Sequence, residues 1–217
     1  MISMNIQFFG GRGQRRGGGG GGKRAWSNGL GMRVYGTAAE ALGTQGEPLS
    51  ISEAVKKANP NYNSEYREYS ENCQRCVTAY EARRRGYDVV AHATYEDDTM
   101  PMGGNWLDCY EGGREALKNV GGANNKRVAK NIETEMLSYG NGARAIVRVR
   151  WQGLDSGHVF NVENQGGKII YSDAQVGSFY KNAKEALEGS AVHETQLVRV
   201  DNLNFTEKVA QAVTKEH

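Results

Sequence analysis

The sequence has 217 residues, of which 38% are hydrophobic, and this length suits one domain of ordinary size with a tail. The formal net charge of +2 hides an uneven distribution, because residues 1–24 contain five basic residues and no acidic residue, so the rest of the chain is net acidic. This distribution argues against a nucleic-acid-binding domain. No apolar run approaches the roughly 20 residues that a membrane-spanning helix needs.

Three cysteines, an odd number, do not make a complete disulfide framework. We therefore expect a reducing compartment or a function that needs a free thiol. Residues 1–9 are too short for a secretory signal and lack a cleavage-site pattern, so export would need another carrier. The sequence leaves the localisation open between association with a virion and delivery into the cytoplasm of a target cell.

The first 24 residues form a tail rich in glycine and arginine, which buries no apolar surface and is expected to be a flexible linker. Its early part, Met4 to Gly10, resembles the start of small head or accessory proteins of tailed phages and mobile elements. This resemblance implies a contact with a phage capsid or a secretion apparatus through residues 1–24. The sequence thus predicts a tail (1–24), a variable lead-in (25–69) and a main domain (70–217).

The lead-in is rich in glycine at first and polar at its end. Ser50 or Ser52 can cap a short helix that runs through Ala58 and ends at Asn59-Pro60. Residues 61–69 are polar and rich in tyrosine, and we expect a loop there.

A longer helix is predicted to begin at Cys73, because four apolar residues follow helical spacing on one face: Cys73, Cys76, Val77 and Tyr80. Arginines at 83–85 favour its last turn, and Gly86 ends it. A short strand is expected over 87–93.

The second half of the chain predicts an antiparallel sheet. An irregular stretch over 95–122 and a helix over 126–139 precede three strand-like runs, at 145–151, 158–163 and 168–172. Asn164-Gln165-Gly166-Gly167 favours a hairpin between the last two runs. A short helix, a strand and a closing helix are expected after them, at 182–187, 196–201 and 206–214. Helices followed by such a sheet indicate the α+β class.

Cys73 is predicted to lie in the first turn of its helix, with Ser70 or Asn72 available as the cap. Backbone N–H groups and the helix dipole at this position stabilise a thiolate, and the same groups can hold an oxyanion beside the sulfur. Cys76 lies one turn further on the same face, where a cysteine usually acts as a small hydrophobic residue. We therefore assign the nucleophile to Cys73 and a core position to Cys76, with the reverse assignment as the alternative.

The spacing Cys73-x-x-Cys76 is also typical of redox pairs and of half a zinc site. Zinc needs four ligands, and the sequence offers one further cysteine, Cys109, without a histidine near it. A redox pair usually follows a strand, whereas a polar loop precedes these cysteines. The sequence favours a thiol nucleophile and predicts no metal and no cofactor.

His158 begins a predicted strand and Asp173 ends the next one, so the hairpin between them brings the two side chains together. A carboxylate on one imidazole nitrogen and a thiol on the other is the arrangement that activates a cysteine. Gln175 follows closely and can donate a hydrogen bond or line the pocket. The remaining histidines have no acid delivered by a hairpin: His92, His193 and His217.

Three separated blocks carry a family resemblance, at residues 72–91, 157–162 and 173–175. They are similar to the papain-fold toxin family of glutamine deamidases, which occurs among polymorphic toxins, bacterial effectors and phage-encoded proteins. The resemblance implies a papain-like cysteine hydrolase fold of the α+β class, with the nucleophile helix packed on a C-terminal antiparallel sheet. Residues 70–217 would then be the catalytic domain.

The resemblance also implies a triad of Cys73, His158 and Asp173, with Asn72 and Gln175 as supporting residues of the pocket or of the oxyanion site. The implied reaction is thiolate attack on a carboxamide of a protein substrate, release of ammonia and hydrolysis of the thioester. Residues 95–140 match no motif and are expected to form the substrate-recognition surface. Two alternatives stay open: a cysteine peptidase of the same fold, and a phage head or virion accessory protein with a degenerate papain-like domain.

Overall fold

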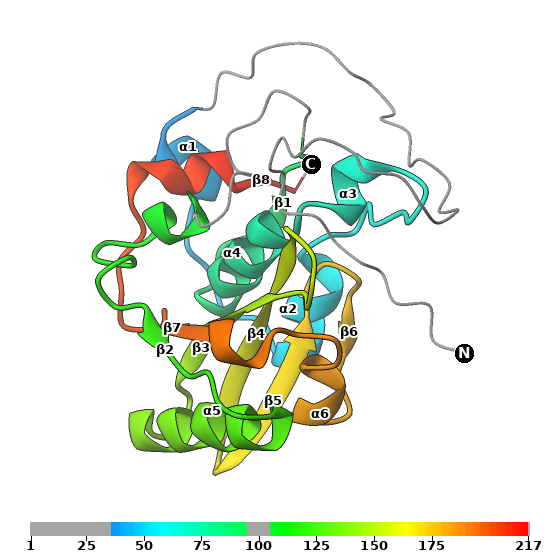
Figure 1. Cartoon of the computed structure of the whole chain (residues 1–217). Helices are drawn as coiled ribbons and strands as arrows, with labels where there is room; N and C mark the ends of the chain where they lie inside the picture. Colours follow the sequence, from blue (N-terminus) through cyan, green and yellow to red (C-terminus); the bar gives the residue numbers. More distant parts are fainter. Residues whose placement is uncertain (1–35, 95–104, 217) are drawn as a thin grey trace.

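The computed structural model describes residues 36–94 and 105–216, in which a six-stranded antiparallel sheet separates two groups of helices (Figure 1). The strand order is β2-β7-β3-β4-β5-β6. In that order the strands are Lys118–Asn119, Gln196–Arg199, Arg144–Arg150, Gly157–Gln165, Lys168–Asp173 and Ser178–Phe179. A second sheet pairs β1 (Val89–Ala91) with β8 (Val213–Lys215), also antiparallel.

Helices cover both faces of the larger sheet. The layer on one face contains α2 and α4, and the layer on the other contains α5 and α6. Helix α1 packs on β8 and η3. The α-helices are Ala38–Leu42, Ile51–Lys57, Arg67–Ser70, Cys73–Arg84, Asn125–Tyr139 and Ala183–Ala186. The 3-10 helices η1, η2 and η3 are Asn105–Cys109, Val192–Glu194 and Glu207–Gln211.

Each face of the sheet contributes to a separate hydrophobic layer, because successive residues of a strand point to opposite sides. Ile146 and Val159 pack in the layer that contains α2 and α4, whereas their neighbours Val147 and Phe160 pack in the layer that contains α5 and α6. The α+β class and the helix packed on an antiparallel sheet, both predicted from the sequence, are confirmed.

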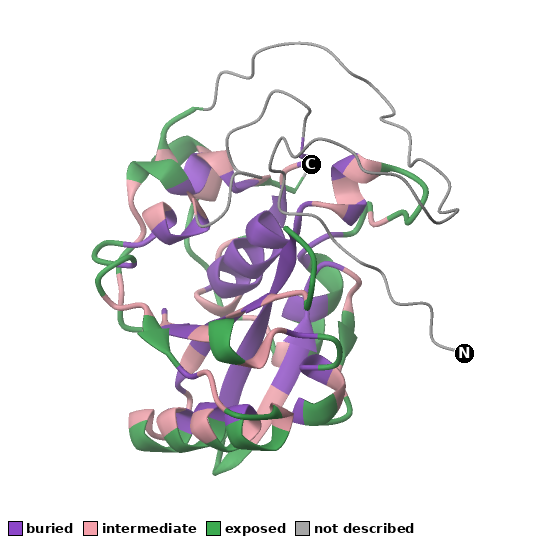
Figure 2. Cartoon of the chain, viewed as in Figure 1, coloured by how far each residue is buried: buried purple, intermediate pink, exposed green. Residues whose placement is uncertain are grey.

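Helix α4 lies at the centre of the first layer and is buried on every side. All its residues from Cys73 to Arg83 are buried, including charged ones (Figure 2). The prediction of a single buried face was therefore too narrow. Elements that precede and follow α4 in the sequence cover its other faces, since α2 and β8 both pack on it.

The charges of α4 are buried together with their partners. Glu81 is fully buried and forms ion pairs at 2.7 Å with both Arg85 and Arg144 of β3. Glu163 of β4 pairs with Arg84 and accepts a hydrogen bond of 2.7 Å from the Tyr80 hydroxyl. Because an unpaired buried charge is very costly, these pairs tie α4 to the sheet at one position.

Several local predictions are confirmed. Ser50 caps α2 and forms a reciprocal capping box with Glu53. The hairpin between β4 and β5 turns at Gly166 and Gly167, whose φ values of 62° and 91° suit a two-residue turn. The predicted helix over 126–139 corresponds to α5.

Two predictions, one at the end of the lead-in and one at the end of the main domain, were wrong. The loop predicted over 61–69 runs into a short helix, α3. The closing helix predicted over 206–214 is replaced by η3 and by β8, because Val213 gains a backbone partner on β1 and a buried position next to α4. Such a long-range pairing outweighs the local preference of a short segment.

The predicted three-part division of the chain stays a prediction. The tail over 1–24 lies outside the described residues. Within the lead-in, Ala54, Val55 and Ala58 are buried in the same layer as Cys76, so these residues contribute to the same hydrophobic core as α4. Among the described helices, none combines the length and the apolar character that crossing a bilayer requires.

We expect the ion pairs of the buried Glu81 to make the largest contribution to the stability of the contact between α4 and the sheet. Glu81→Gln leaves Arg85 and Arg144 without their anion and is expected to lower the free energy of unfolding by about 3–5 kcal/mol. Glu135→Gln is the matched control, because Glu135 pairs with Lys118 at the surface and its loss is expected to cost about 0–1 kcal/mol. Urea unfolding of both variants measures the difference, and equal losses would contradict the account.

Candidate active site

Cys73 is the first residue of α4 and is 4% exposed. The first backbone N–H groups of an α-helix have no acceptor within the helix. In the part of the chain that the structure describes, the N–H groups of Cys73 and Gln74 donate no hydrogen bond. These two donors at the start of the helix can stabilise negative charge that forms beside the sulfur.

The β4–β5 hairpin brings His158 and Asp173 together. The pairing of Asn161 with Ser172 places the two residues on the same face of adjacent strands. The imidazole Nε2 of His158 lies 2.9 Å from Oδ2 of Asp173, and both side chains are buried. The hairpin that the sequence predicts therefore forms an imidazole–carboxylate contact.

This contact is an ion pair at neutral pH. Burial lowers the pKa of His158, but the charge and hydrogen bond of Asp173, together with a smaller contribution from Cys73, raise it to about 10. Burial raises the pKa of Asp173, and the opposing effect of His158 is stronger, so the net shift is downward. With Nε2 bound to Asp173, no described nitrogen or oxygen pairs with Nδ1, which leaves this atom for the Cys73 thiol.

The amide side chains of Asn59, Asn72 and Gln175 form a buried network beside this pair. Asn72 Oδ1 accepts a hydrogen bond of 3.1 Å from Gln175 Nε2, and Asn72 Nδ2 donates one of 3.1 Å to Asn59 Oδ1. Asn59 Nδ2 in turn donates to the carbonyl of Gln175 at 2.9 Å. The network joins the end of α2, the start of α4 and the residues after β5.

Asn72 occupies the N-cap position of α4, but its side chain makes no cap hydrogen bond, so the cap predicted there was wrong. The reason is that buried amide groups need partners, and the network supplies them. Its Nδ2 group also donates to the carbonyl of His92. Because the Nδ2 group of Asn72 is hydrogen-bonded to Asn59 and to the backbone of His92, we infer that Asn72 holds the start of α4 in position.

The three cysteines have different surroundings, and all are free thiols. Cys76 is fully buried, and its Sγ donates to Asn72 Oδ1 at 3.2 Å. Burial, with a contribution from Cys73, raises its pKa well above the ordinary value. Burial likewise raises the pKa of Cys109 to about 12. Both thiols therefore stay protonated at neutral pH, and Cys73 is the cysteine that lies at the start of the helix.

Two aromatic rings lie next to the imidazole of His158. The ring of Trp151 lies parallel to it at 6.3 Å between centroids, and Phe160 lies at 6.4 Å. Tyr180 packs edge-on against Phe160 and donates a hydrogen bond of 2.9 Å to Asp173 Oδ2. Sequence reasoning missed two neighbours of the pair, Trp151 and Tyr180, and also Asn59 of the amide network. The sequence did offer one signal for Tyr180, because its side chain carries a hydroxyl group and follows Asp173 by only seven residues.

The other histidines lie apart from this pair. His92 follows β1, and its backbone bonds to Ala212 and Asn72. His193 lies in η2 and is exposed, and His217 is outside the described residues. Among the residues that the structure describes, no group of three or more histidine, cysteine, aspartate or glutamate side chains is arranged to hold a metal ion.

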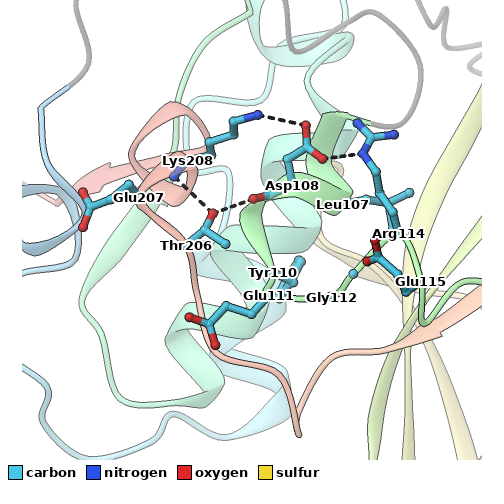
Figure 3. A pocket seen from close by; sticks show the side chains of 11 residues that line it. Leu107, Asp108, Tyr110, Glu111, Gly112, Arg114, Glu115, Thr206, Glu207 and Lys208 are labelled. Atoms are coloured by element: carbon cyan, nitrogen blue, oxygen red, sulfur yellow. Dashed lines mark hydrogen bonds and ion pairs between the residues drawn. The ribbon is translucent and has the colours of Figure 1, made fainter.

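A cavity of about 320 Å³ lies between η1 and η3, away from the residues above (Figure 3). Asp108 lies within it between Arg114 and Lys208, and Thr206 bonds to the backbone of Asp108. Its lining includes neither Cys73 nor His158. The two cationic side chains of its lining, Arg114 and Lys208, are thus paired with the carboxylate of Asp108.

A helix that begins with a cysteine and packs on an antiparallel sheet, with a histidine and an aspartate in contact on that sheet, is the arrangement expected of a papain-like fold. The family model of papain fold toxin 1, glutamine deamidase, matches residues 71–178, which include Cys73, His158 and Asp173. Through this segment, about half its length, the chain belongs to that family, and the resemblance seen in the sequence is confirmed. No curated protein and no solved structure matched the chain.

The raised pKa of His158 predicts a pH-dependent contribution to stability. His158 has an ordinary pKa of 6.5 and a pKa of about 10 in the folded protein, so its stabilisation is complete below pH 6.5 and disappears as the pH rises through 10. Asp173 has a lowered pKa, so its contribution is complete above the ordinary value of 3.8 and disappears at lower pH.

We therefore expect His158→Gln to reduce the free energy of unfolding most between pH 3.8 and 6.5, and progressively less as the pH approaches 10. Urea unfolding of wild type and variant at several pH values measures this. His193→Gln, at an exposed histidine outside this contact, is the control for the loss of an imidazole side chain. A constant difference for His158→Gln across this range would contradict the ion pair.

Proposed function

We propose that this protein is a cysteine hydrolase that deamidates glutamine side chains of a protein substrate, as a toxin or effector. In this proposal Cys73 is the nucleophile, His158 is the general acid and base, and Asp173 orients the imidazole. The observation that carries the proposal is the His158–Asp173 contact of 2.9 Å in a papain-fold deamidase family segment whose cysteine begins a buried helix.

The reaction follows from these positions. The Cys73 sulfur attacks the carboxamide carbon, and the oxyanion receives hydrogen bonds from the free N–H groups at the start of α4. His158 gives a proton to the departing nitrogen, and ammonia leaves as the thioester forms. His158 then takes a proton from water, the resulting hydroxide attacks the thioester, and the product is a glutamate side chain with Cys73 regenerated.

The family match favours a side-chain amide over a peptide bond, because the matched family is described as a glutamine deamidase. Cys73, His158 and Asp173 are 4%, 3% and 6% exposed, so all three side chains are buried. The peptidase alternative uses the same three residues and differs in the leaving amine and in the shape of the cleft.

The contact with a capsid or a secretion apparatus remains a separate proposal. It was predicted for residues 1–24, which lie outside the described residues. The degenerate-domain alternative is less well supported, because His158 and Asp173 keep a direct hydrogen bond and the cysteine keeps its place at the start of α4.

The proposal predicts different effects for the two neighbouring cysteines. Cys73→Ser is expected to lower the deamidation rate by about 10⁴-fold or more, because the nucleophile is lost. Cys76→Ser keeps a donor for Asn72 Oδ1 and is expected to retain most of the activity. Incubation with a cell lysate, followed by peptide mass spectrometry, detects glutamine-to-glutamate conversions and also new chain ends.

Conversions that depend on Cys73 and not on Cys76 would support the proposal. New chain ends without conversions would instead identify a peptidase. Equal activity of wild type and Cys73→Ser would remove Cys73 from the mechanism.

A further inference from the structure

The carboxylate of Asp173 accepts three hydrogen bonds from described groups. Oδ2 receives Nε2 of His158 and the hydroxyl of Tyr180, both at 2.9 Å, and Oδ1 receives the backbone N–H of Gln175 at 3.0 Å. Tyr180 lies directly after β6 and beyond the segment that matches the deamidase family. It is therefore a contact of this chain that the family match does not include.

We propose that Tyr180 is a positioning residue, whose hydrogen bond keeps Asp173 ionised and correctly oriented and thereby sets the lower pH limit of the reaction. This inference rests on the proposed function, in which Asp173 orients His158. A donor to a carboxylate stabilises the charged form, and donors to both oxygens also prevent rotation of the carboxylate.

The position of Tyr180 is itself well fixed. Its backbone N–H donates to the carbonyl of Tyr171 at 3.0 Å, and its ring meets Phe160 edge-on at 5.5 Å between centroids. Burial, and then the charge of Asp173, raise the pKa of Tyr180 well above the ordinary value. Its hydroxyl therefore remains protonated and serves as a donor over the whole working range of pH.

Several titratable groups surround the contact between Tyr180 and Asp173, and a test has to distinguish their effects from that of Asp173. Asp173 interacts with His158 on β4 and with Cys76 on α4, and Tyr180 interacts in addition with Cys73 and with Glu185 of α6. Of these, Glu185 is the second carboxylate, so its titration could be mistaken for that of Asp173. Glu185→Gln removes this ambiguity.

The test compares Tyr180→Phe with Tyr171→Phe and Glu185→Gln in the full chain. Tyr171 is the matched control, because its ring is buried on the same face and its hydroxyl has no described hydrogen-bond partner. Carbon NMR titration of the Asp173 carboxyl group, without substrate, measures its pKa directly. We expect Tyr180→Phe to raise this pKa by about one to two units, and the two controls to leave it in place.

The same shift is expected in the acidic limb of the pH profile of kcat/KM. Site-specific incorporation of 3-fluorotyrosine at position 180, a stronger donor, is expected to lower the pKa of Asp173 and provides a second variant if Tyr180→Phe does not fold. An unchanged Asp173 pKa in these variants, or an equal rise in Tyr171→Phe, would overturn the inference. Because the titration needs no turnover, an inactive wild type would count against the proposed function alone.

Discussion

The burial of α4 on every side is the constraint on which the rest of the structure depends. A helix that carries Glu81, Arg83 and Arg84 into a core is stable only if each charge meets a partner, and residues of β3, β4 and the chain's end provide these partners. The ion pairs fix the helix along its axis and around it, since a shift would leave charges unpaired. Its first residue, Cys73, is therefore held at one place relative to the sheet.

The proposed site lies where this helix meets the sheet. Two structural features bring its residues together: the β4–β5 hairpin and the network of amide side chains. The β4–β5 hairpin pairs His158 with Asp173 within one hairpin, which is a local solution. The amide network connects this pair to the cysteine over much longer distances in sequence, since the Asn59–Gln175 bond spans 116 residues. A hydrolase of this kind needs both, because the imidazole must be oriented and the sulfur must also be within its reach.

The sequence could predict the features that depend on neighbouring residues, but not those that depend on residues far apart in the chain. The cap at Ser50, the glycine turn at Gly166 and Gly167 and the meeting of His158 with Asp173 depend on neighbours in the chain, and local patterns predicted them. The strand β8, the partners of Asn59 and the stacking of Trp151 depend on residues that are distant in sequence, so no local pattern contains them. The cap predicted at Asn72 failed for this reason, because distant amides compete for its side chain.

The most direct test of the central claim is the alkylation rate of each cysteine by iodoacetamide at neutral pH, measured by peptide mass spectrometry. If Cys73 faces an imidazolium held by Asp173, it is alkylated much faster than Cys76 and Cys109, and Asp173→Asn removes most of this advantage. Preferential alkylation of Cys76, or a Cys73 rate unaffected by Asp173→Asn, would contradict the proposed assembly of Cys73, His158 and Asp173.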